Sequence, residues 1–477
     1  MKEAKLFNLL RNISHKEFNE MGDFISSPVM NKKKDFILLY KFLKKNYIET
    51  VNGLVTKEMI FKNVYIREKF NESKYWKLIS GLSTIIDKYL IFSKFEKDIY
   101  YQKNLLLESY RSRNIHKQFD TLSKEIQKKF AKEFNKGLNF YLNRTHYYFQ
   151  KISYLGSADA LVLEDDLKGL FENLKMFFVM TNVTSISIIS NFKKDFLDTA
   201  EKDIWLFQEV FNYLEINKKK ISKEYLTIYI FFLIIKCKLD FNNENYYNEI
   251  KNILIKNNYK FSQNLLRHIL INNLDYTVKK VISGEGRFLK EVFFINKLMD
   301  ENNLTLFGEY IHGDYFYSAV EHSIMLEELG WAKEFAEKYK IYLRNEQRKS
   351  AENLAMSRIH FESGDYELSL TKLLKVENIN PYFYLSYKLL LLQNYFERKE
   401  FYLIDPVIET LSKYLKRRID ISNELKDNYL KFILYFKKLK VTATTRKYLA
   451  KILYKEISSE KFFIYNNWML RKVKEIS

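Results

Sequence analysis

The sequence predicts an all-α fold made of many helices that are joined in pairs. Hydrophobic residues make up 47% of the 477 positions, whereas only 12 glycines and 3 prolines interrupt them. So few helix breakers favour long helices and argue against a disordered chain or a β-protein with many turns. One helical hairpin is nearly repeated in residues 330–381. Such hairpins bury their apolar faces by stacking on neighbours, which predicts an α-solenoid.

The clearest hairpin lies in residues 353–381, NLAMSRIHFESGDYELSLTKLLKVENINP. Two short amphipathic segments flank Gly364, which suits a turn that residues with a Cβ resist. Ser369 supplies a small side chain where the two helices approach closely. Pro381 is expected to stop the second helix. Gly330 precedes Gly364 by 34 positions, a spacing that indicates a repeat.

This hairpin resembles a tetratricopeptide (TPR) repeat, a family whose period is about 34 residues. The residues most usual in that family are replaced at Asn353, Met356, Ser357, Leu373 and Val376. The resemblance implies a TPR-like α-solenoid whose hairpins are clearest at residues 312–420. The alternative interpretation is that two successive helical hairpins give such a near-repeat by chance.

Residues 1–102 are predicted to form an N-terminal helical unit, because their turns carry Ser, Pro, Asn and Gly. Three polar residues are placed to cap the helices that follow them, namely Ser14, Thr56 and Asn71. A helix, a turn and a second helix in residues 56–89 are typical of a winged-helix fragment, in which residues 91–99 would form a strand pair. No Asn-Gly or Asp-Gly pair marks such a wing. A helical cap on the solenoid is the other interpretation.

Residues 103–422 are predicted to form the solenoid, and residues 423–477 are predicted to continue it as basic helices. The opening segment KLFNLLRNISHKEFNEMGDFISSPVMNK, followed by a helical array, is similar to an uncharacterised bacterial family of TPR-like proteins. That resemblance spans most of the chain. It implies an architecture and no activity.

Positive charge is concentrated near the C-terminus. The whole chain carries a formal charge of +20, and residues 411–477 hold 17 basic against 6 acidic residues. Two helices, at about 423–440 and 445–456, are expected to bring the basic side chains together. The candidate contacts to an anionic partner are Lys437, Lys438, Lys440, Arg446 and Lys447. A solvated face whose lysines reflect an AT-rich genome is the alternative interpretation.

The concave face of a solenoid is a natural place to bind a peptide. Aromatic residues with a polar tip, together with one histidine of the TPR-like hairpin, are candidate groove contacts. These residues are His360, Tyr384, Tyr387 and Tyr395. The alternative role of the tyrosines is packing between repeats.

The sequence gives no positive case for catalysis or for a cofactor. The single cysteine, Cys237, excludes an internal disulfide and a thiolate cluster for zinc. No histidine pairs with another at i+3 or i+4, and no Gly-x-Ser-x-Gly motif is present. Residues 284–286, Gly-Glu-Gly, lack the third glycine or the Lys-Ser/Thr of a phosphate loop. We therefore expect no enzyme, no metal and no cofactor, with a distant composite active site as the weakest alternative.

The leading functional hypothesis is a non-enzymatic scaffold for protein-protein interaction. The alternative is a DNA-binding transcriptional regulator with a helical-repeat sensor region, in which nucleic acid contacts the basic patch. The longest apolar run, residues 225–235, is too short to cross a membrane, and the first residues lack the long apolar core of a signal peptide. A cytoplasmic protein with a protein or peptide partner is expected.

Overall fold

The protein is all-helical, as the sequence predicts. We describe it from a computed structural model, in residues 5–155, 160–192, 206–377, 380–445 and 447–477. Within these residues there are 25 α-helices and no β-strand, and only two isolated bridges occur, Phe307 with Tyr310 and Ile311 with Leu343. The chain divides into two compact units, Met1–Glu133 with Tyr141–Leu174, and Phe134–Phe140 with Lys175–Ser477. Each unit is described by itself.

The first unit contains a helical bundle with its own apolar core. Its helices are α1 (Lys5–Arg11), α2 (His15–Ser26), α3 (Lys34–Lys45), α4 (Tyr47–Val51), α5 (Lys57–Val64), α6 (Glu72–Lys97), α7 (Ile99–Ser112), α8 (His116–Lys132), most of α9 (Leu138–Leu155) and the start of α10 (Ala160–Phe192). The core cluster draws its fully buried residues from α1–α3, α5 and α6, among them Leu6, Phe18, Leu39, Phe61 and Leu82.

Local capping signals position these helices, and the three predicted caps are confirmed. The side chains of Ser14, Thr56 and Asn71 accept hydrogen bonds from backbone N–H groups in the first turns of α2, α5 and α6. The predicted strand pair at residues 91–99 is wrong, because α6 continues as one helix to Lys97. No turn signal interrupts that stretch, and Lys94 and Lys97 lie in its last turn, where a helix favours cations.

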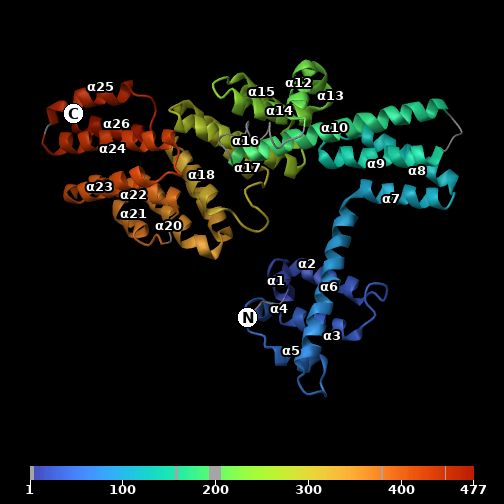
Figure 1. Ribbon diagram of the computed structural model, residues 1–477. Coiled ribbons are helices and arrows are strands. Elements are labelled where there is room, and N and C mark those ends of the chain that lie inside the picture. Colours follow the sequence, from blue (N-terminus) through green and yellow to red (C-terminus); the bar gives the residue numbers. More distant parts are fainter. Residues whose placement is uncertain (1–4, 156–159, 193–205, 378–379, 446) are drawn as a thin grey trace. The chain divides into compact units, whose positions relative to one another are not determined.

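The second unit holds the remaining helices. They are α12 (Phe207–Ile216), α13 (Lys218–Glu224), α14 (Leu226–Leu239), α15 (Asn245–Asn257), α16 (Gln263–Ile282), α17 (Leu289–Glu301), α18 (Gly313–Met325), α19 (Leu329–Tyr339), α20 (Asn345–Glu362), α21 (Tyr366–Leu373), α22 (Pro381–Glu397), α23 (Ile404–Arg417), α24 (Asn423–Thr444), α25 (Ala450–Ser459) and α26 (Asn466–Ile476). Helices α18, α20, α22, α23 and α24 follow one another side by side (Figure 1). One continuous core runs through them from Ile311 to Val473.

The same helix-ending turn recurs in both units. A residue with positive φ follows the helix, and the next backbone N–H donates to the carbonyl five residues earlier, which satisfies a carbonyl that the helix leaves unpaired. Among the described residues, the positive-φ residue of this turn is Gly53, Asn114, Gly284, Asn303, Glu327, Gly364 or Lys399. At Glu327, Gly364 and Lys399 the turn joins the pairs α18–α19, α20–α21 and α22–α23, so successive helices reverse direction in the same way.

The contacts within the TPR-like hairpin match the prediction, but its end does not. Ser369 of α21 is fully buried, and its Oγ lies 3.1 Å from the Oγ of Ser357 in α20, as expected for a close helix approach. Pro381 does not stop α21, which ends at Leu373. Pro381 instead takes the first position of α22, where a backbone N–H would have no acceptor within the helix, so its absence costs nothing. Asn380 caps that helix. The solenoid as a whole stays a prediction.

We expect Gly364→Val to destabilise the α20–α21 hairpin by about 1–2 kcal/mol. The φ of Gly364 is +83°, and an added Cβ would meet no atom within 4 Å, so the cost comes from the backbone and not from a clash. Lys399→Gly is the matched control, because Lys399 holds the equivalent turn at φ +59° and gains freedom from the change. Urea denaturation checks both variants. An unchanged midpoint for Gly364→Val contradicts the prediction.

Candidate functional site

A pocket of about 380 Å³ lies in the second unit between α16, α18, α22, α24 and residues 462–464. Its walls are mainly apolar and include Leu274, Val278, Val281, Ile282, Met325, Leu425, Phe462 and Ile464. The other lining residues carry a polar group: Asp314, Tyr315, Ser318, Glu321, His322, Tyr382, Asn428 and Tyr429. No lysine or arginine lines it among the residues that the structure describes. An apolar cavity with a few convergent polar groups is the usual form of a ligand site.

Glu321 is the most unusual residue of this pocket. Its side chain is in the middle of α18, and the residue is only 2% exposed. Three tyrosine hydroxyls donate to its carboxylate: Tyr317 to Oε1 at 2.9 Å, Tyr382 to Oε2 at 2.8 Å, and Tyr465 to Oε1. A buried carboxylate needs such donors, since its charge has lost its water. All three donors are neutral side chains, and the positive charge that interacts with Glu321 is that of the buried Arg358.

The tyrosines around Glu321 stay protonated. Burial raises the pKa of the Tyr382 phenol well above its usual value, and the neighbouring Glu321 carboxylate raises it further. Burial likewise raises the pKa of Tyr317, and Glu321 adds to it. Each phenol therefore keeps the proton that it donates to Glu321 across the physiological pH range.

His322 adds a neutral polar group beside Glu321. The residue is 8% exposed, and its Nδ1 lies 3.1 Å from the Oγ of Ser318 one turn earlier on α18. Burial lowers the pKa of His322, and the Glu321 carboxylate opposes that shift only in part. Among the described residues no carboxylate is hydrogen-bonded to His322, so this Ser-His pair lacks the third group that orients the base of a catalytic triad.

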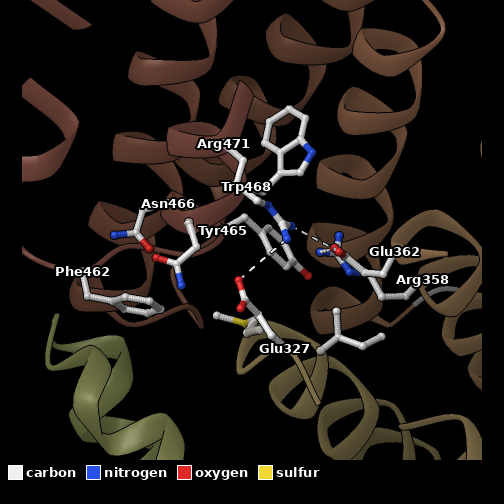
Figure 2. Close-up of a pocket in the computed structure, with 11 residues that line it drawn as sticks. Glu327, Arg358, Glu362, Phe462, Tyr465, Asn466, Trp468 and Arg471 are labelled. Carbon is white, nitrogen blue, oxygen red and sulfur yellow. Dashed lines mark hydrogen bonds and ion pairs between the residues drawn. The ribbon is translucent and has the colours of Figure 1, made fainter. Parts of the chain in front are cut away.

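A buried arginine packs against the ring of Tyr465 (Figure 2). The guanidinium of Arg358 lies 4.0 Å from the ring centroid, and Arg358 is 1% exposed. Its Nη2 donates to Glu362 Oε1 and its Nη1 to Gln393 Oε1, both at 2.6 Å. Figure 2 also shows Arg471 reaching Glu362 across a small hollow of about 20 Å³, room for about one water molecule.

The predicted basic patch is only partly available as free charge. Lys437, Lys438 and Lys440 lie on α24, which runs to Thr444 and is one turn longer than expected. Lys438 pairs with Glu456 at 2.5 Å, and Lys440 pairs with Asp405 at 2.7 Å. Lys437 is exposed and has no ion pair among the described residues. Arg446 lies outside the described residues, as does the side chain of Lys447.

A groove of about 370 Å³, distinct from the Glu321 pocket, lies beside this patch between α24 and α25. Its lining residues are Lys437, Lys438, Val441, Thr442, Leu449, Ile452, Leu453 and Glu456. Large apolar side chains face solvent at Leu430, Leu434 and Val441 of α24, at Tyr448 in the turn before α25, and at Ile452 of α25. The spacings of four and seven residues place the three side chains of α24 on one stripe of that helix. Lys437, Lys451 and Lys455 are exposed on the same two helices and form no ion pair within the part of the chain that the structure describes.

The four predicted groove residues are half-buried. The three tyrosines lie on α22, and Tyr387 is close enough to Tyr384 and Tyr395 to interact with both electrostatically. Tyr384 of α22 packs on Tyr414 of α23, with ring centroids 4.2 Å apart. Lys388 lies over the rings of Tyr384 and Tyr387, at 5.4 and 5.7 Å. Tyr387 and Tyr395 pack against the core. His360 is on α20 and has no ring contact with these tyrosines in the described part of the chain.

Sequence reasoning missed the Glu321 pocket. A signal was present, because Glu321 and His322 interrupt the run from Tyr315 to Met325, which is otherwise apolar apart from Ser318 and Ser323. Arg358 likewise stands in the middle of an apolar face of α20. Charged residues inside an apolar helix are rarely buried without partners, so such positions are candidates for a buried polar network.

No helix among the described residues has the length and apolar character needed to span a membrane. In the same residues, no group of three or more His, Cys, Asp or Glu side chains is arranged to hold a metal ion. Comparisons of the chain with protein-family models, with curated proteins and with solved structures find no match.

Proposed function

We propose that the protein is a non-enzymatic scaffold that binds a protein partner, with its helical hairpins stacked as a TPR-like solenoid. The observation that carries the proposal is the groove between α24 and α25, where apolar side chains are exposed beside unpaired lysines. Val441 is 42% and Ile452 is 56% exposed. Soluble proteins seldom leave such side chains together on one surface unless something covers them.

The chemistry of the groove favours an acidic amphipathic helix as the partner segment. Its apolar face would cover Val441 and Ile452, and its carboxylates would meet Lys437, Lys451 and Lys455. A helix in an apolar groove is a common mode of peptide recognition, and complementary charge speeds and orients the encounter. A cytoplasmic location fits this role and is part of the proposal.

A DNA-binding regulator is the alternative, and two observations weigh against it. Lys438 and Lys440 already pair with Glu456 and Asp405, which reduces the charge that the patch offers to phosphate. Helix α6 is continuous through the residues where a wing would form. The basic balance of the whole chain is compatible with either partner, so the choice needs an experiment.

The test compares an apolar variant, Ile452→Asp, with a charge variant, Lys437→Gln/Lys451→Gln. We expect both variants to lose a protein captured from the native cell after nuclease treatment. Residual capture by the charge variant should fall less with rising salt than capture by the wild type, because fewer charge contacts are left to screen. Ile255→Asp and Lys256→Gln/Lys290→Gln are matched controls, because Ile255 is 57% exposed and the two lysines are exposed and have no ion pair with any described residue.

Duplex DNA binding is measured on the same variants at two salt concentrations. Each phosphate contact would steepen the logarithmic salt dependence by about 0.9. Loss of DNA binding by Lys437→Gln/Lys451→Gln, with no protein partner affected by either variant, contradicts the scaffold and favours the regulator.

A further inference from the structure

We infer that the pocket at Glu321 binds an ammonium or guanidinium group carried on an aliphatic stem. This site is separate from the groove between α24 and α25, and the inference does not rest on the proposed function. It rests on the volume and lining of the pocket, on the charge of that lining and on the partners of its buried carboxylate.

The pocket has room for a small group and apolar side chains that suit an aliphatic stem. Its volume is about 380 Å³, and its apolar lining includes Leu274, Val278 and Ile282 of α16 and Met325 of α18. The aliphatic chain of a lysine side chain or of an alkylamine would bury its methylene groups against these residues.

The charge of the lining is negative. Glu321 and Asp314 both line the pocket, His322 is neutral, and the remaining polar groups are tyrosine, serine and asparagine side chains. Arg358 does not line the pocket and pairs with its own carboxylate partner, Glu362, although its charge also interacts with Glu321. Asp314 is exposed and receives one hydrogen bond, from Asn380 at 2.7 Å. A cation inside the pocket would meet two carboxylates and no competing lysine or arginine of the lining.

The partners of Glu321 leave a position for one more donor. Two tyrosines donate to Oε1, whereas Tyr382 alone donates to Oε2. An ionised carboxylate oxygen accepts about two hydrogen bonds, so Oε2 has capacity for another. Tyr382 and Tyr429 also line the pocket, and aromatic rings attract a desolvated cation. An ammonium or guanidinium group supplies the hydrogen-bond donor and the positive charge together.

Isothermal titration of the full-length chain with small probes tests the inference. The cationic probes are n-butylammonium and Nα-acetyl-lysine N-methylamide, and n-butanol and butyrate are the neutral and anionic controls. We expect both cations to bind at about 1 mM or tighter, as small ligands of few atoms can, and at least tenfold more tightly than the controls. Tighter binding of the blocked lysine would assign the pocket to a peptide side chain, and tighter binding of n-butylammonium to a free amine.

Variants locate the binding and distinguish a ligand site from a structural network. Tyr382→Phe removes the hydroxyl that occupies Oε2, so we expect it to bind the cations at least threefold more tightly, whereas a purely structural role predicts no gain. Asp314→Asn and Glu321→Gln should weaken binding, the second by at least tenfold, and Val278→Trp should block it by filling the pocket. If Glu321→Gln does not fold, Tyr382→Phe and Val278→Trp decide the question.

Equal binding of cations and controls would overturn the inference. So would cation binding that survives in Val278→Trp, because the probes would then bind elsewhere. The net charge of +20 makes the test stringent, since non-specific attraction to this chain favours anions over cations. Failure of these titrations leaves the partner capture at the α24–α25 groove unaffected, and the converse also holds.

Discussion

Replacing Arg358 with methionine is expected to destabilise the second unit by about 3–5 kcal/mol. The side chain of Arg358 is 1% exposed, and it holds Glu362 and Gln393 at 2.6 Å each. Methionine restores part of the packing against Tyr465 but donates no hydrogen bond. Gln393 is fully buried, so its carbonyl oxygen would lose its partner without gaining water.

The control is Arg348→Met on the same helix. Arg348 pairs with Glu352 at 3.4 Å, but its side chain is 43% exposed, and an exposed pair contributes about 1 kcal/mol or less. The chain has two compact units, and units that unfold separately do not give a two-state transition of the whole chain. Hydrogen exchange in α20 and α22 therefore measures the local free energy of opening, with urea denaturation as a second probe.

A triple variant separates two explanations of the stability that Arg358→Met loses. Arg358→Met/Glu362→Leu/Gln393→Leu replaces the whole polar cluster with apolar residues, and we expect it to recover at least half of the lost stability, because no buried polar group is left without a partner. If the triple variant is as unstable as Arg358→Met, the contribution of Arg358 comes from the packing of its guanidinium on Tyr465 and Phe361 instead.

The parts of the fold that were predicted from sequence depend on neighbours along the chain. Ser14 and Asn71 cap helices because an oxygen two or three residues before a helical N–H reaches it whatever the tertiary structure. Gly364 takes a positive φ for a similarly local reason. Pro381 shows the limit of such reasoning: a proline is compatible with the end of one helix and with the start of the next, and the packing of α22 selects the second.

The candidate sites were less predictable because they join residues far apart in sequence. Tyr317, Glu321 and Tyr382 meet Tyr465, which lies 144 positions beyond Glu321. In the sequence no acidic neighbour marks Lys440 as paired, but in the fold α23 places Asp405 beside it. Helical periodicity indicates that a side chain faces the interior, but it does not identify the residue from another helix that it contacts there.

The stability of the second unit is expected to depend on pH through Lys238. Lys238 is half-buried near the end of α14, where its ammonium donates to Ser190 Oγ at 2.7 Å, to Asn272 Oδ1 at 3.1 Å and to the Ser187 carbonyl oxygen at 3.4 Å. Burial lowers the pKa of Lys238 to about 8, Asp275 opposes that shift, and the nearby Lys279 adds to it. A lysine in the unfolded chain titrates near pH 10.4.

The sign of the effect follows from these two values. Below about pH 8 both states carry the charge, so the free energy of unfolding changes little with pH there. Between pH 8 and about 10.4 the folded state releases the proton while the unfolded state keeps it, so the free energy of unfolding rises with pH. From pH 7.5 to 9.5 the gain is on the order of 2 kcal/mol.

Lys238→Met removes this titration, so wild type and variant should diverge as the pH rises. The neighbouring thiol of Cys237 acts in the opposite direction, because burial raises its pKa to about 12 and the unfolded thiol ionises first. Both proteins are therefore compared in a Cys237→Ala background by urea denaturation. Buried tyrosines such as Tyr276 also have a raised pKa, and they oppose the gain only above about pH 10, where unfolded tyrosine ionises. Parallel stability profiles between pH 7.5 and 9.5 would show that Lys238 reaches water in the folded protein, because a solvated ammonium has the same pKa in both states.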